Sequence, residues 1–578
     1  MDGSATKQVV RVDGENAAYG GMNEAQKLRL QYAVEVLTVA ALCAFFFFYG
    51  LGNFGLVGAD EPRYAQVARE MLDRDDFVTP TLHGDPWLEK PALYYWRATA
   101  AFRTFGVQDW VARLPSATFA LALVVIIYFH MRRFRPGAQL DAALITASAA
   151  AIIGFSRGAS TDMQLAAPFA IAMLGWYAWY ETNSKFWLFD LYFFLAVGTL
   201  AKGPVAPGLA AVIIIVFAGI RRDWRLALRT LWIPGILTYC IVVLPWFIMV
   251  QLKNPDFLRV FIFEHNLERF ATDTFKHKYP PWYYLPVWFL SLLPWTIYAI
   301  AAIAEAVRET WQDWRRSAPG VARESGELGD SFAEFLVIWA VLPVIFFSLS
   351  QSKLPGYILP AIPPCTILIA DYLQKRRGHH VRNRLLAAHS VIVGVVTATV
   401  LLLPHLVLQS RQAPPVQALW LAIGVGVVVA LATFFIVRLQ GHEVLRIVSM
   451  IPVVLTAFFL LRSAAWVIDA AYSSRPVARY LAKLEHDNLK PGFRPAAVFD
   501  TRRDVEFGLG FYRDEKVSRY ERGEIPKVEH LLVARDGEHE QLKKLLAGRY
   551  FVSFGPPGPA NPQHLEVFWV SSSGASKE

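Results

Sequence analysis

Acidic and basic residues that could do chemistry gather just after the first apolar segment of the sequence. The run Asp60-Glu61-Pro62-Arg63-Tyr64 is too polar to lie in lipid, so we place it at a membrane face. A carboxylate beside a sugar C1 acts as a base, a nucleophile or a stabiliser of positive charge. Asp60 is therefore the first catalytic candidate. The alternative is that Asp60 only caps a helix that begins at Glu61-Pro62.

Three cations are predicted to share that face with Asp60. They are Arg63, Lys90 and Lys202, each close to the end of an apolar segment. Such a cluster suits a phosphate or pyrophosphate, which guanidinium and ammonium groups bind by charge-assisted hydrogen bonds. The alternative is that each side chain only reaches towards lipid headgroups.

Two further segments offer polar groups on the same predicted face. Asp162 follows a short polar run and could orient a substrate amine, or else cap a helix or pair with Arg157. Lys353 and Tyr357 lie in Ser352-Lys353-Leu354-Pro355-Gly356-Tyr357 and could close over a headgroup. The alternative for this second segment is a plain tight turn.

One histidine could bind a metal. His265, together with Glu89 or Glu264, has the donor types that a divalent ion such as zinc prefers. Because these ligands are scattered in sequence, a hydrogen-bonded loop histidine is the alternative. The sequence does not require a cofactor.

The elements that position these residues are predicted to be membrane helices. The sequence has 578 residues, of which 54% are hydrophobic and 18% charged, below the charged share of about 25% in soluble proteins. Hydropathy predicts about thirteen spans. They lie near 31–51, 111–131, 139–156, 163–181, 186–201, 204–220, 231–251, 284–303, 333–349, 356–373, 385–404, 416–437 and 447–467.

The basic residues predict the orientation of these spans. With thirteen spans, the clusters at Lys27/Arg29, Arg132–Arg135, Arg221–Arg225, Arg308–Arg316, Lys375–Arg377 and Arg438 all fall on one side. The positive-inside rule places that side in the cytoplasm and the Asp60 segment outside. The net charge of +9 is scattered between spans, which argues against nucleic-acid binding.

Three domains follow from this reading. Residues 1–30 form a cytoplasmic tail, residues 31–471 the membrane domain and residues 472–578 a soluble periplasmic α/β domain. In the last, we expect helices at Arg475–Glu485 and Glu540–Leu546. We expect strands at Ala496–Phe499, His530–Ala534, Tyr550–Phe554 and Leu565–Val570. Between the first two spans, we expect outer helices at Glu61–Leu72 and Pro91–Phe105.

Several motifs together resemble a known family. They are Ala59–Tyr64, Trp87–Trp96, Lys202-Gly203-Pro204, Phe263–Asn266 with Arg269-Phe270, and Ser352–Tyr357. In this order they are similar to the lipid-linked glycosyltransferases of the GT-C fold. Within that group they resemble the bacterial aminoarabinose transferases of lipid A (glycosyltransferase family 83), which are related to protein O-mannosyltransferases.

The resemblance implies a reaction. Such enzymes move 4-amino-4-deoxy-L-arabinose from undecaprenyl phosphate to a lipid A phosphate on the periplasmic face of the inner membrane, which gives resistance to polymyxin and cationic peptides. It implies that Asp60 and Asp162 are the catalytic pair. It also implies that Arg63, Lys90 and Lys202 bind the lipid phosphate and that Tyr64, Tyr94 and Tyr95 line the pocket. We add Arg269, Lys353 and Tyr357, which lie in the quoted motifs, as substrate-binding candidates. We expect the chain to act as a monomer.

Two alternatives stay open. One is sugar transfer to a protein hydroxyl, as in protein O-mannosyltransferases, which would require Asp60 to act as a true base. The other is a transporter or flippase of the lipid-linked sugar, although transporters place polar groups at mid-membrane and these spans carry few charges there.

Overall fold

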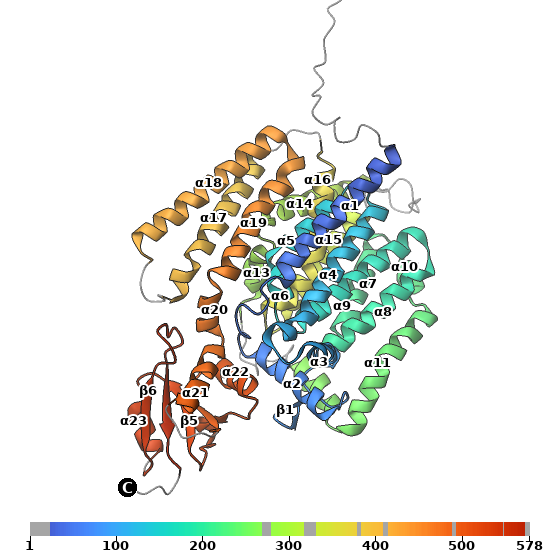
Figure 1. The fold of residues 1–578 in the computed structure, drawn as a ribbon. Coiled ribbons are helices and arrows are strands. Elements are labelled where there is room, and N and C mark those ends of the chain that lie inside the picture. Colours follow the sequence, from blue (N-terminus) through green and yellow to red (C-terminus); the bar gives the residue numbers. More distant parts are fainter. Residues whose placement is uncertain are drawn as a thin grey trace, which may run out of the picture.

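The computed structural model describes residues 23–268, 279–316, 331–377, 383–408, 414–487, 493–546 and 548–572 (Figure 1). Arg269 and most of the predicted N-terminal tail lie outside these ranges, and so does the side chain of His265.

The larger part of the chain is helical, with one two-stranded antiparallel hairpin. Its elements are α1 (Glu24–Cys43), η1 (Ala44–Phe48), α2 (Asp60–Arg74), β1 (Thr81–Leu82), β2 (Asp85–Pro86), α3 (Leu93–Phe105), α4 (Asp109–Phe134), α5 (Gln139–Ser148), α6 (Ala150–Ser156), α7 (Asp162–Thr182), α8 (Lys185–Lys202), α9 (Val205–Ile220), α10 (Trp224–Thr230), α11 (Ile233–Lys253), η2 (Arg259–Glu268), η3 (Pro281–Tyr283), α13 (Tyr284–Ser291), α14 (Thr296–Arg316), α15 (Ser331–Leu349), η4 (Pro355–Ala361), α16 (Ile362–Gln374), α17 (Asn383–Leu408), α18 (Val416–Gln440), η5 (His442–Val444), α19 (Leu445–Arg462) and α20 (Ala465–Tyr472).

The chain is a helical multi-span membrane protein, but fewer of its helices qualify as spans than the thirteen predicted. Among the described residues, eight are long and apolar enough, or ten if two bent pairs each count as one span. Every predicted range does contain helix. The remaining three ranges hold α7, α8 and α9. Helix α9 has only 16 residues, α8 carries three charges in 18 residues, and the Trp and Tyr residues of α7 lower its hydropathy.

Helix α7 lies in the centre of the core. From Met163 to Trp179 every side chain is buried, and the helix packs against α8, α4 and η4. Because large apolar faces of several helices meet on α7, this helix fixes where its first residue, Asp162, lies.

Two helices outside the spans lie at one end of the bundle (Figure 1). Helix α2 buries Tyr64, Val67, Ala68 and Met71, which confirms the amphipathic helix predicted there. Helix α3 packs against it, and the two share one cluster of buried side chains.

The C-terminal domain is a five-stranded mixed sheet in the order β4-β3-β5-β7-β6, with β3 parallel to β4 and β5 and the other pairs antiparallel. Its elements are α21 (Arg475–Asp487), β3 (Ala496–Phe499), α22 (Arg503–Arg513), β4 (Ser518–Arg519), η6 (Tyr520–Arg522), β5 (His530–Arg535), α23 (His539–Leu545), β6 (Phe551–Gly555) and β7 (Leu565–Val570).

The four predicted strands and two predicted helices of this domain are present, but helix α22 was not predicted. Gly508 and Gly510 in its middle disfavour helix by about 1 kcal/mol each. Both are tightly packed: a Cβ on Gly508 would lie 2.4 Å from Ser474 Oγ, and one on Gly510 would lie 3.1 Å from His83 Cε1. These glycines serve the close approach of α22 to its neighbours.

The C-terminal domain lies at the same end of the bundle as α2 and α3 (Figure 1). Phe507 and Phe511 of α22 belong to the buried cluster that α2 and α3 form. The two parts of the chain are therefore joined by a shared hydrophobic core beside Asp60.

Candidate active site

Asp60 is the first residue of α2, and its carboxylate is not used as a helix cap. The N-cap is Ala59, and no side chain bonds the free backbone N–H groups there. This contradicts the capping alternative for Asp60. Its Oδ1 instead accepts a hydrogen bond from Arg63 Nη2, one turn along the helix. The side chain of Asp60 is 56% exposed, so one carboxylate oxygen remains open to a ligand.

Arg63 is a buried cation held among aromatic rings. Its guanidinium carbon lies 4.9 Å from the ring centroid of Trp87, 5.4 Å from that of Phe507 and 5.5 Å from that of Tyr64. Its Nε has no hydrogen-bond partner among the described residues. The site therefore holds a fixed cation with a donor to spare.

The charge of Arg63 is maintained despite its burial. Burial lowers its pKa, but the neighbouring Tyr64, Asp60 and Glu89 outweigh that effect and raise the pKa above its ordinary value. Glu89 thus lies within electrostatic reach of Arg63.

Three tyrosines predicted to bind substrate pack against one another beneath α2. The ring centroids of Tyr64, Tyr94 and Tyr95 lie 5.8 to 6.2 Å apart. The Tyr94 hydroxyl donates to Ala112 O, and burial raises the pKa of all three phenols. Tyr94 and Tyr95 are fully buried, so they support the wall of the site rather than face solvent.

Glu61 is a structural residue that the sequence analysis missed. Its Oε2 accepts from Arg113 Nη2 at 2.7 Å and from Val57 N at 2.9 Å, and its Oε1 accepts from Ala159 N at 3.0 Å. Glu61 thus joins the segment before Asp60 to the segment before Asp162. A buried arginine on a span, Arg113, could have been noticed in the sequence as a charge that needs a partner.

The second group of predicted residues forms around Asp162. Lys202 Nζ donates to Asp162 Oδ1 at 2.5 Å, and the same ammonium lies 5.1 Å from the ring centroid of Tyr357. A Cβ on Gly356 would lie 2.4 Å from Asp162 Oδ1, so a larger residue there would displace the carboxylate. Asp162 therefore pairs with Lys202, and no ion pair with Arg157 is found between these described residues.

Lys353 and Lys90 are the other two lysines predicted to bind substrate. Lys353 is 4% exposed, donates to Ser350 O at 2.5 Å, and has its pKa lowered by burial. Lys90 lies between β2 and α3, next to Glu89, and is half-buried. Arg269 lies outside the described residues.

The predicted metal pair is not tested. Within the described part of the chain, no group of three or more His, Cys, Asp or Glu side chains could hold an ion. Glu89 is described, whereas the side chain of His265 is not. A site at Glu89 and His265 stays a prediction.

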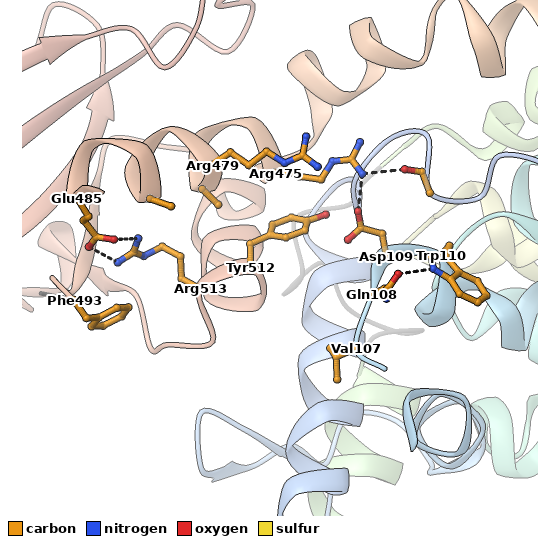
Figure 2. A pocket seen from close by; sticks show the side chains of 13 residues that line it. Val107, Gln108, Asp109, Trp110, Arg475, Arg479, Glu485, Phe493, Tyr512 and Arg513 are labelled. Carbon is orange, nitrogen blue, oxygen red and sulfur yellow. Dashed lines mark hydrogen bonds and ion pairs between the residues drawn. The ribbon is translucent and has the colours of Figure 1, made fainter. Parts of the chain in front are cut away.

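A cleft of about 620 Å³ lies between the C-terminal domain and the start of α4 (Figure 2). Figure 2 shows Tyr512 and Arg475 reaching across it towards Asp109. Arg475 is paired with Asp109 and Asp469, and Arg513 with Glu485, so these guanidinium groups are already neutralised. None of the predicted site residues lines this cleft.

Comparisons with known proteins agree with the predicted resemblance. Residues 33–261 match the family model of dolichyl-phosphate-mannose-protein mannosyltransferases. The chain is 32% identical over 343 residues to the undecaprenyl phosphate-alpha-4-amino-4-deoxy-L-arabinose arabinosyl transferase of Pseudomonas aeruginosa UCBPP-PA14, which covers 58% of this chain and 59% of that protein. It is 28% identical over 349 residues to the enzyme of that name from Edwardsiella ictaluri, with coverage of 59% and 60%. The chain thus spans about three fifths of the length of these relatives.

The fold also matches solved structures. The crystal structure of ArnT from Cupriavidus metallidurans bound to undecaprenyl phosphate gives a TM-score of 0.72 at 21% identity, covering 94% of this chain and 99% of that one. Its apo form gives 0.70 at 22% identity, covering 93% and 98%. At this identity the match establishes a shared fold.

Proposed function

We propose that this chain is a membrane glycosyltransferase that moves 4-amino-4-deoxy-L-arabinose from undecaprenyl phosphate to a phosphate of lipid A, and so confers resistance to polymyxin and cationic peptides. The donor is the one in the names of the relatives, and undecaprenyl phosphate is bound in the similar structure. The lipid A acceptor comes from the motif resemblance. The observation that carries the proposal is the pair of Asp60 and Arg63: an exposed carboxylate beside a buried guanidinium with an unused donor.

The reaction needs charge stabilisation more than proton transfer. An oxygen of the acceptor phosphate attacks C1 of the sugar, the bond from C1 to the undecaprenyl phosphate oxygen breaks, and that oxygen keeps the electron pair. The acceptor phosphate is already ionised at neutral pH, so no proton has to leave. Asp60 orients the acceptor and stabilises the positive charge that develops at C1.

Arg63 acts on the leaving group. Its guanidinium is fixed by Trp87, Tyr64 and Phe507 and stays charged, so it neutralises the departing phosphate without reorganising. We assign Lys90 to the same phosphate. Asp162 and Lys202, held by Gly356 and Tyr357, form a second polar group that receives the amino sugar or the acceptor.

We place the site at the periplasmic face of the bacterial inner membrane. The C-terminal domain, α2 and α3 lie at one end of the bundle (Figure 1). Basic residues lie in the loops after α9 and α16, where Arg221 pairs with Glu334 of α15 and Arg376 pairs with Glu305 of α14. By the positive-inside rule those loops are cytoplasmic. In this arrangement α7, α8 and α9 also cross the membrane, residues 31–471 form the membrane domain, residues 472–578 are periplasmic, and the chain acts as a monomer.

The alternatives make different demands. Transfer to a protein hydroxyl would need Asp60 as a base, yet Oδ1 of its carboxylate already accepts a hydrogen bond from Arg63. A transporter would need polar groups at mid-membrane, whereas Asp60 and Arg63 lie on a helix outside the spans.

Mass spectrometry of lipid A tests the proposed function in cells. A strain that lacks its own aminoarabinose transferase but makes the lipid-linked donor is compared with and without this chain. We expect an added aminopentose on lipid A phosphate only when the chain is expressed. Unmodified lipid A at normal expression of the folded protein would refute the assignment.

A further inference from the structure

Helix α22 of the C-terminal domain brings a second arginine to the ring that lines the Arg63 site. The guanidinium carbon of Arg503 lies 5.4 Å from the ring centroid of Phe507, the same distance as that of Arg63. The two guanidinium carbons are therefore at most about 11 Å apart. Phe507 itself is 8% exposed and belongs to the buried cluster of α2 and α3.

Arg503 has no anionic partner among the described residues, unlike several other arginines of this domain. Arg475, Arg513 and Arg519 each pair with carboxylates. The neighbouring Arg502 is bound to Asp504. Arg503 is exposed and forms no ion pair with any residue in the described ranges. Its charge is therefore available to a ligand.

The position of α22 relative to α2 is closely fixed. Arg69 donates to Phe511 O at 2.8 Å and pairs with Asp514 at 3.1 Å, and Gln66 donates to Asp514 at 3.2 Å. These contacts lie one and two turns along α2 from Arg63. These contacts therefore fix the position of Arg503 next to the Arg63 site.

Nearby contacts fix the segment that leads into Asp60. Leu56 N donates to Tyr512 OH at 2.7 Å, Gly55 N to Asp469 Oδ1 at 2.7 Å and Gly58 N to Tyr472 O at 3.2 Å. The C-terminal domain and its connecting helix therefore determine the geometry of the catalytic segment.

We propose that Arg503 is a phosphate-binding residue of the active site and takes the phosphate of the acceptor lipid, while Arg63 takes that of the donor. This rests on the proposed function and extends it. In the transition state, C1 of the sugar is partly bonded to one oxygen of each phosphate. Two cation sites a short distance apart can then each neutralise one phosphate. Guanidinium binds phosphate in a bidentate manner, and an ammonium does not reproduce that geometry.

Steady-state kinetics with separate titrations of donor and lipid A test the proposal. We expect Arg503→Ala to raise the acceptor KM about tenfold and to leave the donor KM unchanged, and Arg503→Lys to recover only part of the loss. Arg479→Ala is the matched control, since Arg479 is exposed on the adjacent helix α21 and also has no ion pair within the described residues. An unchanged acceptor KM in Arg503→Ala, or an equal rise in Arg479→Ala, would overturn the proposal.

A labelling experiment separates this inference from the proposed function. Phenylglyoxal modifies accessible arginines, and mass spectrometry gives the rate at each site. In the intact wild-type protein, nanodiscs that contain phosphatidic acid should slow the labelling of Arg503, and phosphatidylcholine nanodiscs should not. Such protection supports a phosphate site even if no sugar transfer to lipid A is found. Equal labelling in both nanodiscs would reject the phosphate site even if transfer is active.

Discussion

Arg113 Nη2 donates to Glu61 Oε2 at 2.7 Å, and neither side chain is more than 10% exposed. Arg113 also donates to the backbone oxygens of Leu51, Phe54 and Gly55. This one pair holds the turn between the first span and Asp60 against the second span. It does so with Glu61, the residue next to the catalytic candidate.

Removing one member of this pair should unfold the site. Glu61→Ala leaves Arg113 buried without its carboxylate and frees the N–H groups of Val57 and Ala159, which should cost about 3–5 kcal/mol. We expect a clear drop in melting temperature in detergent and loss of transfer. Asp73→Asn on the exposed face of α2 is the control and should change neither. A Glu61→Ala protein as stable as the wild type would contradict this role.

Gly356 should be needed for the position of Asp162. A Cβ there would lie 2.4 Å from Asp162 Oδ1, so Gly356→Ala must push the carboxylate away from Lys202. Displacing one charge-stabilising group costs about 10²-fold in kcat. Transfer assays should detect that loss with little change in melting temperature. Gly208→Ala on α9, where a Cβ meets nothing within 4 Å, should keep full activity. Full activity of Gly356→Ala would refute a role for this contact.

The hydroxyl of Tyr512 should fix the segment before Asp60. Tyr512→Phe leaves Leu56 N without its acceptor, a loss of about 1–3 kcal/mol for a buried group. Hydrogen exchange followed by mass spectrometry should show faster exchange in residues 54–58. Tyr550→Phe, at an exposed position of the same domain, is the control. No change in exchange would mean that the C-terminal domain does not hold this segment.

The C-terminal domain should lose stability in mild acid because of His530. This side chain is fully buried, donates from Nδ1 to Val528 O and accepts at Nε2 from Tyr520 OH. Burial lowers its pKa from 6.5 to about 4. Between pH 6.5 and about 4, His530 is therefore protonated in the unfolded state but neutral in the folded state. Stability is complete above pH 6.5 and falls, by up to about 3 kcal/mol, as the pH drops towards 4.

Hydrogen exchange in β5, corrected for intrinsic rates, measures this effect between pH 7 and pH 4.5. His530→Gln should weaken the pH dependence, and His486→Gln, at an exposed position, should leave it unchanged. A pH dependence that is the same in His530→Gln would show that other groups cause it.

Local patterns predicted a good part of this structure. Every predicted span contains helix, the amphipathic face of α2 is buried as predicted, and the strand at Ala496–Phe499 is found with its predicted bounds. These features follow from periodicity within one element. Counting spans was less successful, because α7 and α8 carry aromatic or charged residues that lower their hydropathy, and α9 is apolar but only 16 residues long.

The parts that were missed depend on contacts between distant segments. Helix α22 was missed because Gly508 and Gly510 disfavour helix in isolation and are explained only by their close neighbours. Glu61 and Arg113 are 52 residues apart, and nothing in the local sequence pairs them. An ion pair with Arg157, five residues earlier, was one alternative considered for Asp162, but Lys202, 40 residues later, is its partner.

Transfer of the sugar by the purified protein tests the central claim most directly. Wild-type protein and Asp60→Asn are incubated with the undecaprenyl-phosphate-linked aminoarabinose and lipid A, and the product is measured by mass spectrometry. We predict an aminopentose on lipid A phosphate with the wild type and at least a 10²-fold slower reaction with Asp60→Asn, at equal melting temperatures. Full activity of Asp60→Asn, or no transfer by the folded wild type, would contradict the account.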